Sequence, residues 1–101
     1  MAKALVNWIK PEDGGKRKKL EIDFIFYPMI KIDGDNDLIH WSFYIINKEF
    51  ISEYQTISEI DFLLENAPHY LLKPGIKFKL YEGGIKEVAS GEIINNLNEN
   101  S

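Results

Sequence analysis

The sequence contains no cysteine, which excludes disulfide bridges and zinc sites built from thiolates. It also contains no apolar run long enough to span a bilayer. Asn7 and Lys10 interrupt the N-terminal apolar segment before it reaches the length of a signal-peptide core. These absences predict a cytoplasmic protein that has no membrane partner.

Positive charge is scarce as well. The chain has 12 Lys and Arg residues against 16 Asp and Glu residues, which gives a formal net charge of -4. Nucleic-acid binding relies on cations that displace counterions from phosphates, so this balance disfavours a nucleic-acid partner. The one basic cluster is a run with acidic residues on both sides: Lys16, Arg17, Lys18 and Lys19. A solvated strand end is the favoured interpretation of this run, ahead of a contact with an acidic protein surface and of an RNA site.

Histidine is rare, and no catalytic or metal-binding motif stands out. His40 and His69 lie far apart in the sequence, and no motif supplies either with the carboxylate or nucleophile that a general base needs. Asp33, Asp35 and Asp37 have the spacing that begins a calcium loop, but the later ligands of such a loop are missing. We therefore expect no enzyme activity, no cofactor and no metal site.

What the sequence does contain is typical of a folded β protein. Hydrophobic residues make up 45% of the 101 residues and aromatic residues 13%, which is enough for the core of one ordinary domain. Apolar and polar residues alternate along several short segments, the pattern of strands with one buried face. We expect a single domain over residues 1–94 and a polar, disordered tail over residues 95–101.

The alternation predicts strands at residues 4–9, 20–27, 29–32, 38–46, 77–81 and 86–94. The expected core faces are Leu20, Ile22, Phe24 and Phe26 in the second segment, and Ile39, Trp41, Phe43 and Ile45 in the fourth. Residues 50–64 fit a strand or a helix, because their apolar residues suit both spacings, and the strand is favoured, with Ile60, Phe62 and Leu64 on one face. Pro28 predicts an edge, a bulge or a bend, since it has no N–H to donate.

Glycine and proline mark the expected turns. Residues 11–15 predict a hairpin turn between the first two strands, and residues 47–49 are expected to break the fourth strand. Residues 73–75 fit a type II turn, with Pro and Gly at its central positions. A Glu-Gly-Gly turn is expected to join the two halves of a hairpin over residues 77–94. Many short strands with closely spaced turns predict an antiparallel barrel or sandwich.

Two stretches at opposite ends of the chain carry a resemblance to a known family. The first runs over residues 8–16 and contains an acidic-Gly-Gly-basic turn; the second runs over residues 67–91 and contains Pro68, Gly75, Phe78, Glu82-Gly83-Gly84 and Val88. Together they resemble the C-terminal, third domain of translation elongation factor Tu. The resemblance implies an all-β fold, a small antiparallel β-barrel, that meets protein partners and helps to hold the T-stem of aminoacyl-tRNA.

The chain also departs from that family. Residues 21–65 show no alignment with it, and the nucleotide-binding domain is absent, so no GTPase activity follows from the resemblance. The segment between Gly84 and Gly91 is one residue longer than the family pattern. Tyr81 stands where the family carries Arg, which removes a phosphate ligand from the tRNA contact.

We expect a binding site, for a protein partner or RNA, at the turn-rich end of the barrel. Its candidate residues are Trp8, Lys16, Arg17, Lys18, Lys19, Tyr81, Glu82 and Gly83. Trp8 and Tyr81 are expected to be exposed, because each lies next to a turn. The favoured function is a non-enzymatic protein-interaction module that acts on or mimics part of the translation machinery, including an immunity-type role. The alternatives are a tRNA- or RNA-binding domain and, last, a small enzyme that uses His40 or His69.

Overall fold

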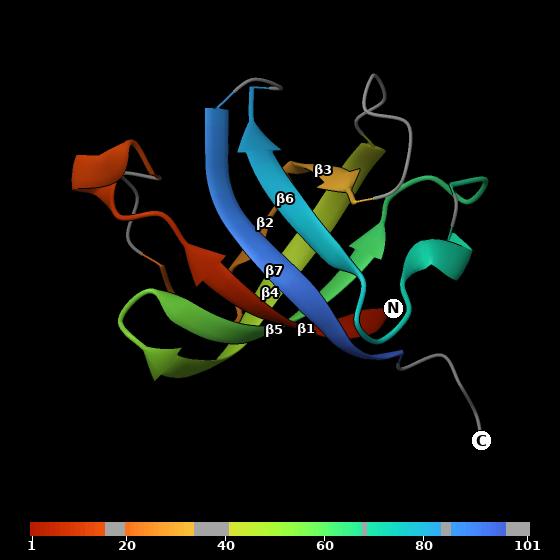
Figure 1. The fold of residues 1–101 in the computed structure, drawn as a ribbon, viewed down its shortest axis with the longest axis horizontal. Helices are drawn as coiled ribbons and strands as arrows, with labels where there is room; N and C mark the ends of the chain where they lie inside the picture. Colours follow the sequence, from red (N-terminus) through yellow and green to blue (C-terminus); the bar gives the residue numbers. More distant parts are fainter. Residues whose placement is uncertain (16–19, 34–40, 68, 84–85, 97–101) are drawn as a thin grey trace.

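The structure, a computed structural model, describes residues 1–15, 20–33, 41–67, 69–83 and 86–96 (Figure 1). The strands in these residues are β1 (Ala2–Trp8), β2 (Ile25–Phe26), β3 (Met29–Ile32), β4 (Trp41–Ser52), β5 (Gln55–Phe62), β6 (Lys77–Glu82) and β7 (Lys86–Asn96). Two short 3-10 helices, η1 (Pro11–Asp13) and η2 (His69–Leu71), lie in the connections. Among the described residues, no helix is long and apolar enough to cross a membrane.

Six of the described strands close into a barrel. Their order is β4, β3, β6, β7, β1 and β5, and pairing of β5 with β4 completes the ring. The short β2 is an additional strand that also pairs with β4, and every pairing is antiparallel. The prediction of an all-β fold with a small antiparallel β-barrel is confirmed, whereas the likeness to the elongation factor domain stays a prediction.

Strand alternation sends one face of each strand into the barrel. On β1 the inward residues are small until the last one, the bulky Trp8: Ala2, Ala4, Val6 and Trp8. Most of the other large buried side chains come from other strands, and Phe43 and Phe78 are the largest of those that are almost wholly enclosed. Each such side chain contributes about 1.5–3 kcal/mol relative to an exposed position.

Predictions that rest on local pattern are largely confirmed. Met29–Ile32 is the strand expected there, and residues 50–62 are extended rather than helical, with a turn at 53–54 between β4 and β5. Phe43 and Ile45 are buried as expected, and Trp41 packs against the core. Gly75 has φ 91°, and the N–H of Ile76 donates to the Lys73 carbonyl, as a type II turn requires.

The hairpin expected over residues 77–94 is present as β6 and β7. β7 continues beyond that range to Asn96 and pairs there with the start of β1. The rest of the expected tail, residues 97–101, lies outside the described residues. So do Lys16, Arg17, Lys18, Lys19, Asp35, Asp37, Ile39 and His40.

The strand expected over residues 20–27 is wrong for its first half. Residues 22–23 form a turn, and only Ile25–Phe26 is extended. Asp23 adopts the left-handed conformation, with φ 63°, which Asp tolerates better than most residues. Its N–H donates to the Asn47 carbonyl at 2.7 Å, and its carboxylate accepts a hydrogen bond from Lys48 Nζ at 2.8 Å. The turn breaks the alternation, so Ile22 and Phe24 are exposed instead of lining the core.

The hairpin expected at residues 11–15 is also wrong. Pro11 begins the 3-10 turn η1, Gly14 closes it at φ 94°, and the N–H of Gly15 donates to the Lys10 carbonyl. Among the described residues, β1 pairs with β5 and β7, and not with the segment that follows this turn. Residues 11–15 do form a turn, but this turn does not join two strands that pair with each other.

Two expectations about the middle of the chain need correction. β4 does not break at residues 47–49; it continues to Ser52, and a shift of register between Asn47 and Glu49 absorbs the irregularity. Ile60 and Phe62 share a buried face as expected, but Leu64 lies beyond the end of β5 and is 50% exposed.

Gly91 gives the first testable prediction. A Cβ atom built there would lie 2.5 Å from the Phe78 ring and 2.7 Å from the Leu5 carbonyl oxygen, so the ring and a neighbouring strand must both move to admit a side chain. We expect Gly91→Ala to lower the free energy of unfolding by about 1–3 kcal/mol, measured by urea denaturation. The matched control is Ser90→Ala on the same strand, which is expected to change it by less than about 0.5 kcal/mol. Equal stability of the two variants would contradict this packing.

Candidate functional site

The barrel has a small cleft at one open end, which we call the mouth cleft. It is lined by Trp8, Phe26, Tyr27, Pro28, Glu82 and Val88, and its volume is about 60 Å³. These residues come from the end of β1, from the junction of β2 with β3, and from the two strands of the β6–β7 hairpin. The mouth of a β-barrel is a common place for a binding site, because loops and strand ends converge there around a rigid scaffold.

The junction of β2 with β3 shapes one wall of the mouth cleft. Both strands pair with the same strand, β4: Ile25 lies opposite Ile46, and Met29 lies opposite Ser42. They are therefore one extended segment that is interrupted between the two pairings. Pro28 lies in the interruption, where its carbonyl still accepts a hydrogen bond from the N–H of Phe43 at 3.1 Å. Of the predicted edge, bulge or bend, the bulge is wrong, because Phe26 lies opposite Ile45 and Met29 opposite Ser42, so no residue is inserted between the two pairings.

Trp8 forms the floor of the mouth cleft. The expectation that it is exposed is wrong, because it continues the inward series of β1 and is only 6% exposed. Its indole N–H donates to Thr56 Oγ1 at 2.9 Å, and its ring lies against Phe26 with centroids 5.7 Å apart. The turn that follows does not expose this side chain, because Trp8 is still part of β1 and the turn begins only at Pro11.

Behind Trp8 lies a small buried polar cluster. Asn47, Thr56 and Ser58 are all fully buried. Asn47 Oδ1 accepts hydrogen bonds from Ser58 Oγ at 2.9 Å and Thr56 Oγ1 at 3.2 Å, and the two hydroxyl oxygens are 2.9 Å apart. Because buried polar groups are costly unless they are paired, this cluster fixes the position of the hydroxyl that holds the indole.

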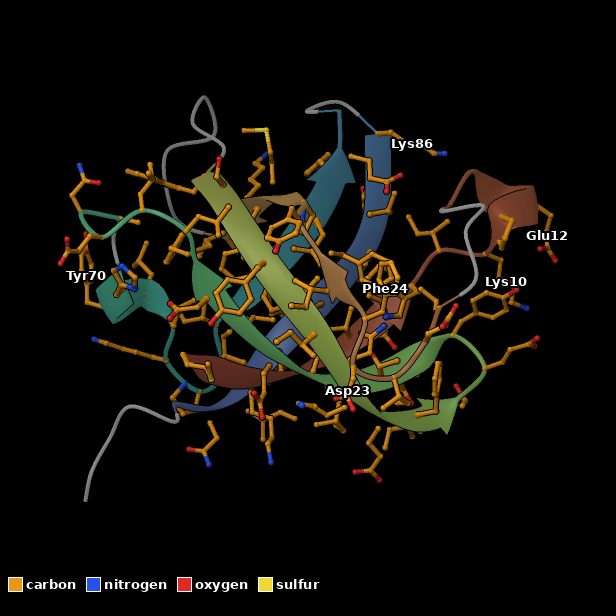
Figure 2. All side chains as sticks on the ribbon, turned by 180° about the vertical axis from the view of Figure 1, so that it is seen from behind. Lys10, Glu12, Asp23, Phe24, Tyr70 and Lys86 are labelled. Atoms are coloured by element: carbon orange, nitrogen blue, oxygen red, sulfur yellow. The ribbon has the colours of Figure 1, made fainter. Side chains whose placement is uncertain are left out.

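One edge of the mouth carries large apolar side chains that face solvent. We call this set the rim: Ile22, Phe24, Ile25 and Tyr27, with exposed fractions of 44%, 37%, 43% and 67%. The Phe24 ring lies against Phe26 with centroids 5.1 Å apart, so aromatic rings run in contact from Trp8 in the interior to Phe24 at the surface. Figure 2 shows Phe24 in the half of the molecule that holds Lys10 and Glu12, with Tyr70 at the opposite end.

The sequence contained a signal for this rim. Both faces of residues 20–27 carry large apolar residues, and a strand with one buried face cannot bury both sets. The turn at Asp23, which decides which of them are exposed, depends on a hydrogen bond to Asn47 and could not be read locally. The carboxylate of Asp23 also raises the pKa of Lys48, chiefly through their hydrogen bond.

The β6–β7 hairpin forms the opposite wall of the mouth cleft. Glu82 follows the buried Leu80 by two positions, so strand alternation turns its side chain toward the mouth. Tyr81 is half-buried and, by the same alternation, lies on the other side of β6. Gly83 is exposed and has φ 64°, a conformation that glycine adopts without strain. Of the predicted site residues, the structure brings Trp8 and Glu82 together in the cleft.

His69 lies away from the mouth, beside the end of β5. Its Nδ1 is 3.1 Å from Asp61 Oδ1 and its Nε2 is 3.0 Å from the Leu64 carbonyl oxygen, while its ring meets the edge of Phe62. Both ring nitrogens therefore contact acceptors of the chain itself and tie the loop after β5 to the barrel. Partial burial, with the negative charge of Asp61 and Glu59, raises the pKa of the nearby Tyr44 hydroxyl. Among the described residues, no group of three or more His, Cys, Asp or Glu side chains is placed to hold a metal ion.

A second, larger concavity lies on the outer face of β1, β6 and β7. It has a volume of about 320 Å³ and is lined by Leu5, Asn7, Asp33, Lys77, Phe78, Lys79, Ser90, Gly91 and Glu92. Its charges have mixed sign, and Lys79 lies 4.0 Å from Glu87. Charges of both signs along this groove give it no clear preference for a ligand, so the mouth cleft is the stronger candidate.

A comparison with models of known protein families finds no match, and a comparison with curated protein sequences finds none either.

The hydrogen bond behind Trp8 gives the second testable prediction. Thr56→Val keeps the shape of the side chain but leaves the indole N–H without its acceptor, so we expect a loss of about 1–3 kcal/mol of unfolding free energy. In a Trp41→Phe background, the indole N–H resonance of Trp8 is expected to move in a proton NMR spectrum.

The control is Thr56→Ser, which retains the hydroxyl and is expected to leave that resonance near its original position. An unchanged indole resonance in Thr56→Val would contradict the hydrogen bond.

Proposed function

We propose that this chain is a non-enzymatic protein-interaction module that binds a protein partner through the mouth cleft and its rim. The observation that carries the proposal is the rim itself, a set of four large, exposed apolar side chains within six residues of sequence. Scattered exposed apolar residues are common on protein surfaces, but contiguous ones mark interaction sites. Aromatic side chains at such a site supply much of the binding energy.

The position of the rim strengthens the proposal. The rim lies along one edge of a cleft in which the indole of Trp8 is held in place, because it is hydrogen-bonded to Thr56 and packed on Phe26. The ion pair between Asp23 and Lys48 and the hydrogen bond of the Asp23 N–H hold the turn that presents the rim. A surface that is already ordered loses less conformational entropy on binding.

The resemblance described above suggests a direction for the biology. The third domain of elongation factor Tu meets protein partners, and the two resembling stretches contribute Trp8 and Glu82 to the mouth cleft. We therefore extend the proposal to a partner in, or directed at, the translation machinery. The structure is all-β in its described part, which is compatible with that extension.

Affinity capture with matched surface variants tests this function. The tagged full chain is incubated with a nuclease-treated extract of its own cells, and so are two variants of it. Ile22→Ser with Ile25→Ser removes rim residues that do not line the cleft; Leu63→Ser with Leu64→Ser changes residues of similar exposure elsewhere. We expect one protein to be retained by the unchanged chain and the control, and to be lost at least tenfold with the rim variant, as for a binding hot spot.

Circular dichroism melting curves establish that both double variants are folded. Equal retention by the rim variant would contradict the proposal. Recovery of RNA in place of protein, from an extract left without nuclease, would favour the alternative of an RNA-binding domain.

A further inference from the structure

We propose that the mouth cleft receives the positively charged end of a lysine or arginine side chain from the partner protein. The inference rests on the proposed function and names the chemistry that the partner presents. Three properties of the cleft carry it: its size, the rings that line it, and the position of Glu82.

The size of the cleft limits the occupant to the end of one side chain. Its volume is about 60 Å³, whereas pockets for metabolites and cofactors span about 300–1,000 Å³. A cleft several times smaller than those pockets suits an ammonium or guanidinium group at the end of a side chain better than a whole nucleobase or sugar.

The lining of the cleft favours a cation. Trp8, Phe26 and Tyr27 bring three aromatic rings to it, and the faces of aromatic rings carry negative charge density that attracts cations. Clefts that combine several rings are a recurring solution for binding ammonium groups. An apolar side chain would also contact these rings, so the rings alone leave the choice open.

The carboxylate of Glu82 favours a cation over an apolar side chain as the occupant of the cleft. The Glu82 side chain is directed to the mouth by strand alternation and lines the cleft. A cation forms a charge-assisted hydrogen bond with this carboxylate in addition to the contact that Glu82 makes within the chain, whereas an apolar side chain gains nothing from the carboxylate. A carboxylate has about four acceptor positions, so it can bind a cation while keeping other contacts. The formal net charge of -4 draws cationic partners toward the chain over longer distances.

The cleft is also formed before any ligand arrives. The hydrogen bond to Thr56 fixes the indole of Trp8, the proline ring of Pro28 is rigid, and Val88, which also lines the cleft, is almost fully buried. Tyr27 is the one lining ring that is mostly exposed, at 67%, and it is therefore free to close on a bound side chain.

Titration of the full chain with three short peptides tests this inference. The probes are acetyl-Gly-Lys-Gly-amide, its norleucine analogue, which lacks the charge, and its glutamate analogue. Binding is followed by the indole N–H resonance of Trp8 in a Trp41→Phe background. We expect the lysine peptide to bind with a Kd in the millimolar range and at least about fivefold more tightly than the norleucine peptide, with no binding of the glutamate peptide.

Variants of the lining residues identify the groups responsible. We expect Glu82→Gln and Tyr27→Leu each to weaken lysine-peptide binding by about threefold to tenfold. The matched controls are Glu65→Gln and Tyr70→Leu, which change exposed residues outside the cleft and are expected to leave binding unchanged. Equal binding of the lysine and norleucine peptides, no shift of the indole resonance up to about 50 mM peptide, or equal effects of the controls would overturn the inference.

The outcome is distinguishable from failure of the proposed function. The rim variant with Ile22→Ser and Ile25→Ser leaves the cleft lining intact, so it is expected to bind the lysine peptide normally while losing the captured protein. A chain that captures its partner through the rim but shows no preference for the lysine peptide retains the proposed function and loses this inference.

Discussion

The hydrogen bond from the Trp8 indole to Thr56 is the interaction on which the candidate site depends. It holds a bulky ring across the end of the barrel, where the inward positions of β1 are otherwise small. The bonds among Thr56, Asn47 and Ser58 offset part of the cost of burying them, although Asn47 Nδ2 has no hydrogen-bond partner among the described residues, and those bonds fix the position of the Thr56 hydroxyl.

The walls of the mouth arise from interruptions of the sheet. Pro28 separates β2 from β3 without releasing either from β4, and the turn at Asp23 leaves Ile22 and Phe24 exposed. Apolar side chains that a continuous strand would bury are thereby placed at the surface. The regular strands form the barrel, and the residues around the two interruptions form the rim and one wall of the mouth cleft.

Elements that depend on neighbours in sequence were predictable, and those that depend on distant partners were not. The β6–β7 hairpin and the turn at Gly75 follow from local residue types. β1 instead pairs with strands about 50 and 90 residues away, which no local signal reveals. The predicted hairpin between β1 and the segment that follows it was therefore wrong. The burial of Trp8 follows from the same distant pairing, because only the closed ring gives its side chain an interior to enter. Of the candidate site, Trp8 and Glu82 were identified from the sequence, while Phe26, Tyr27 and Pro28 were recognised only from the fold.

Proximity of a partner to the mouth can be measured directly. A photoreactive benzoylphenylalanine placed at Tyr27, which is 67% exposed beside the cleft, is compared with the same group placed at Tyr70, which is 70% exposed at the other end. After irradiation in cells, the account predicts one cross-linked protein from position 27, attached next to a lysine or arginine of that protein, and none of this product from position 70. The same cross-linked protein in equal yield from both positions, or none from position 27, would contradict the claim that the mouth is the binding face.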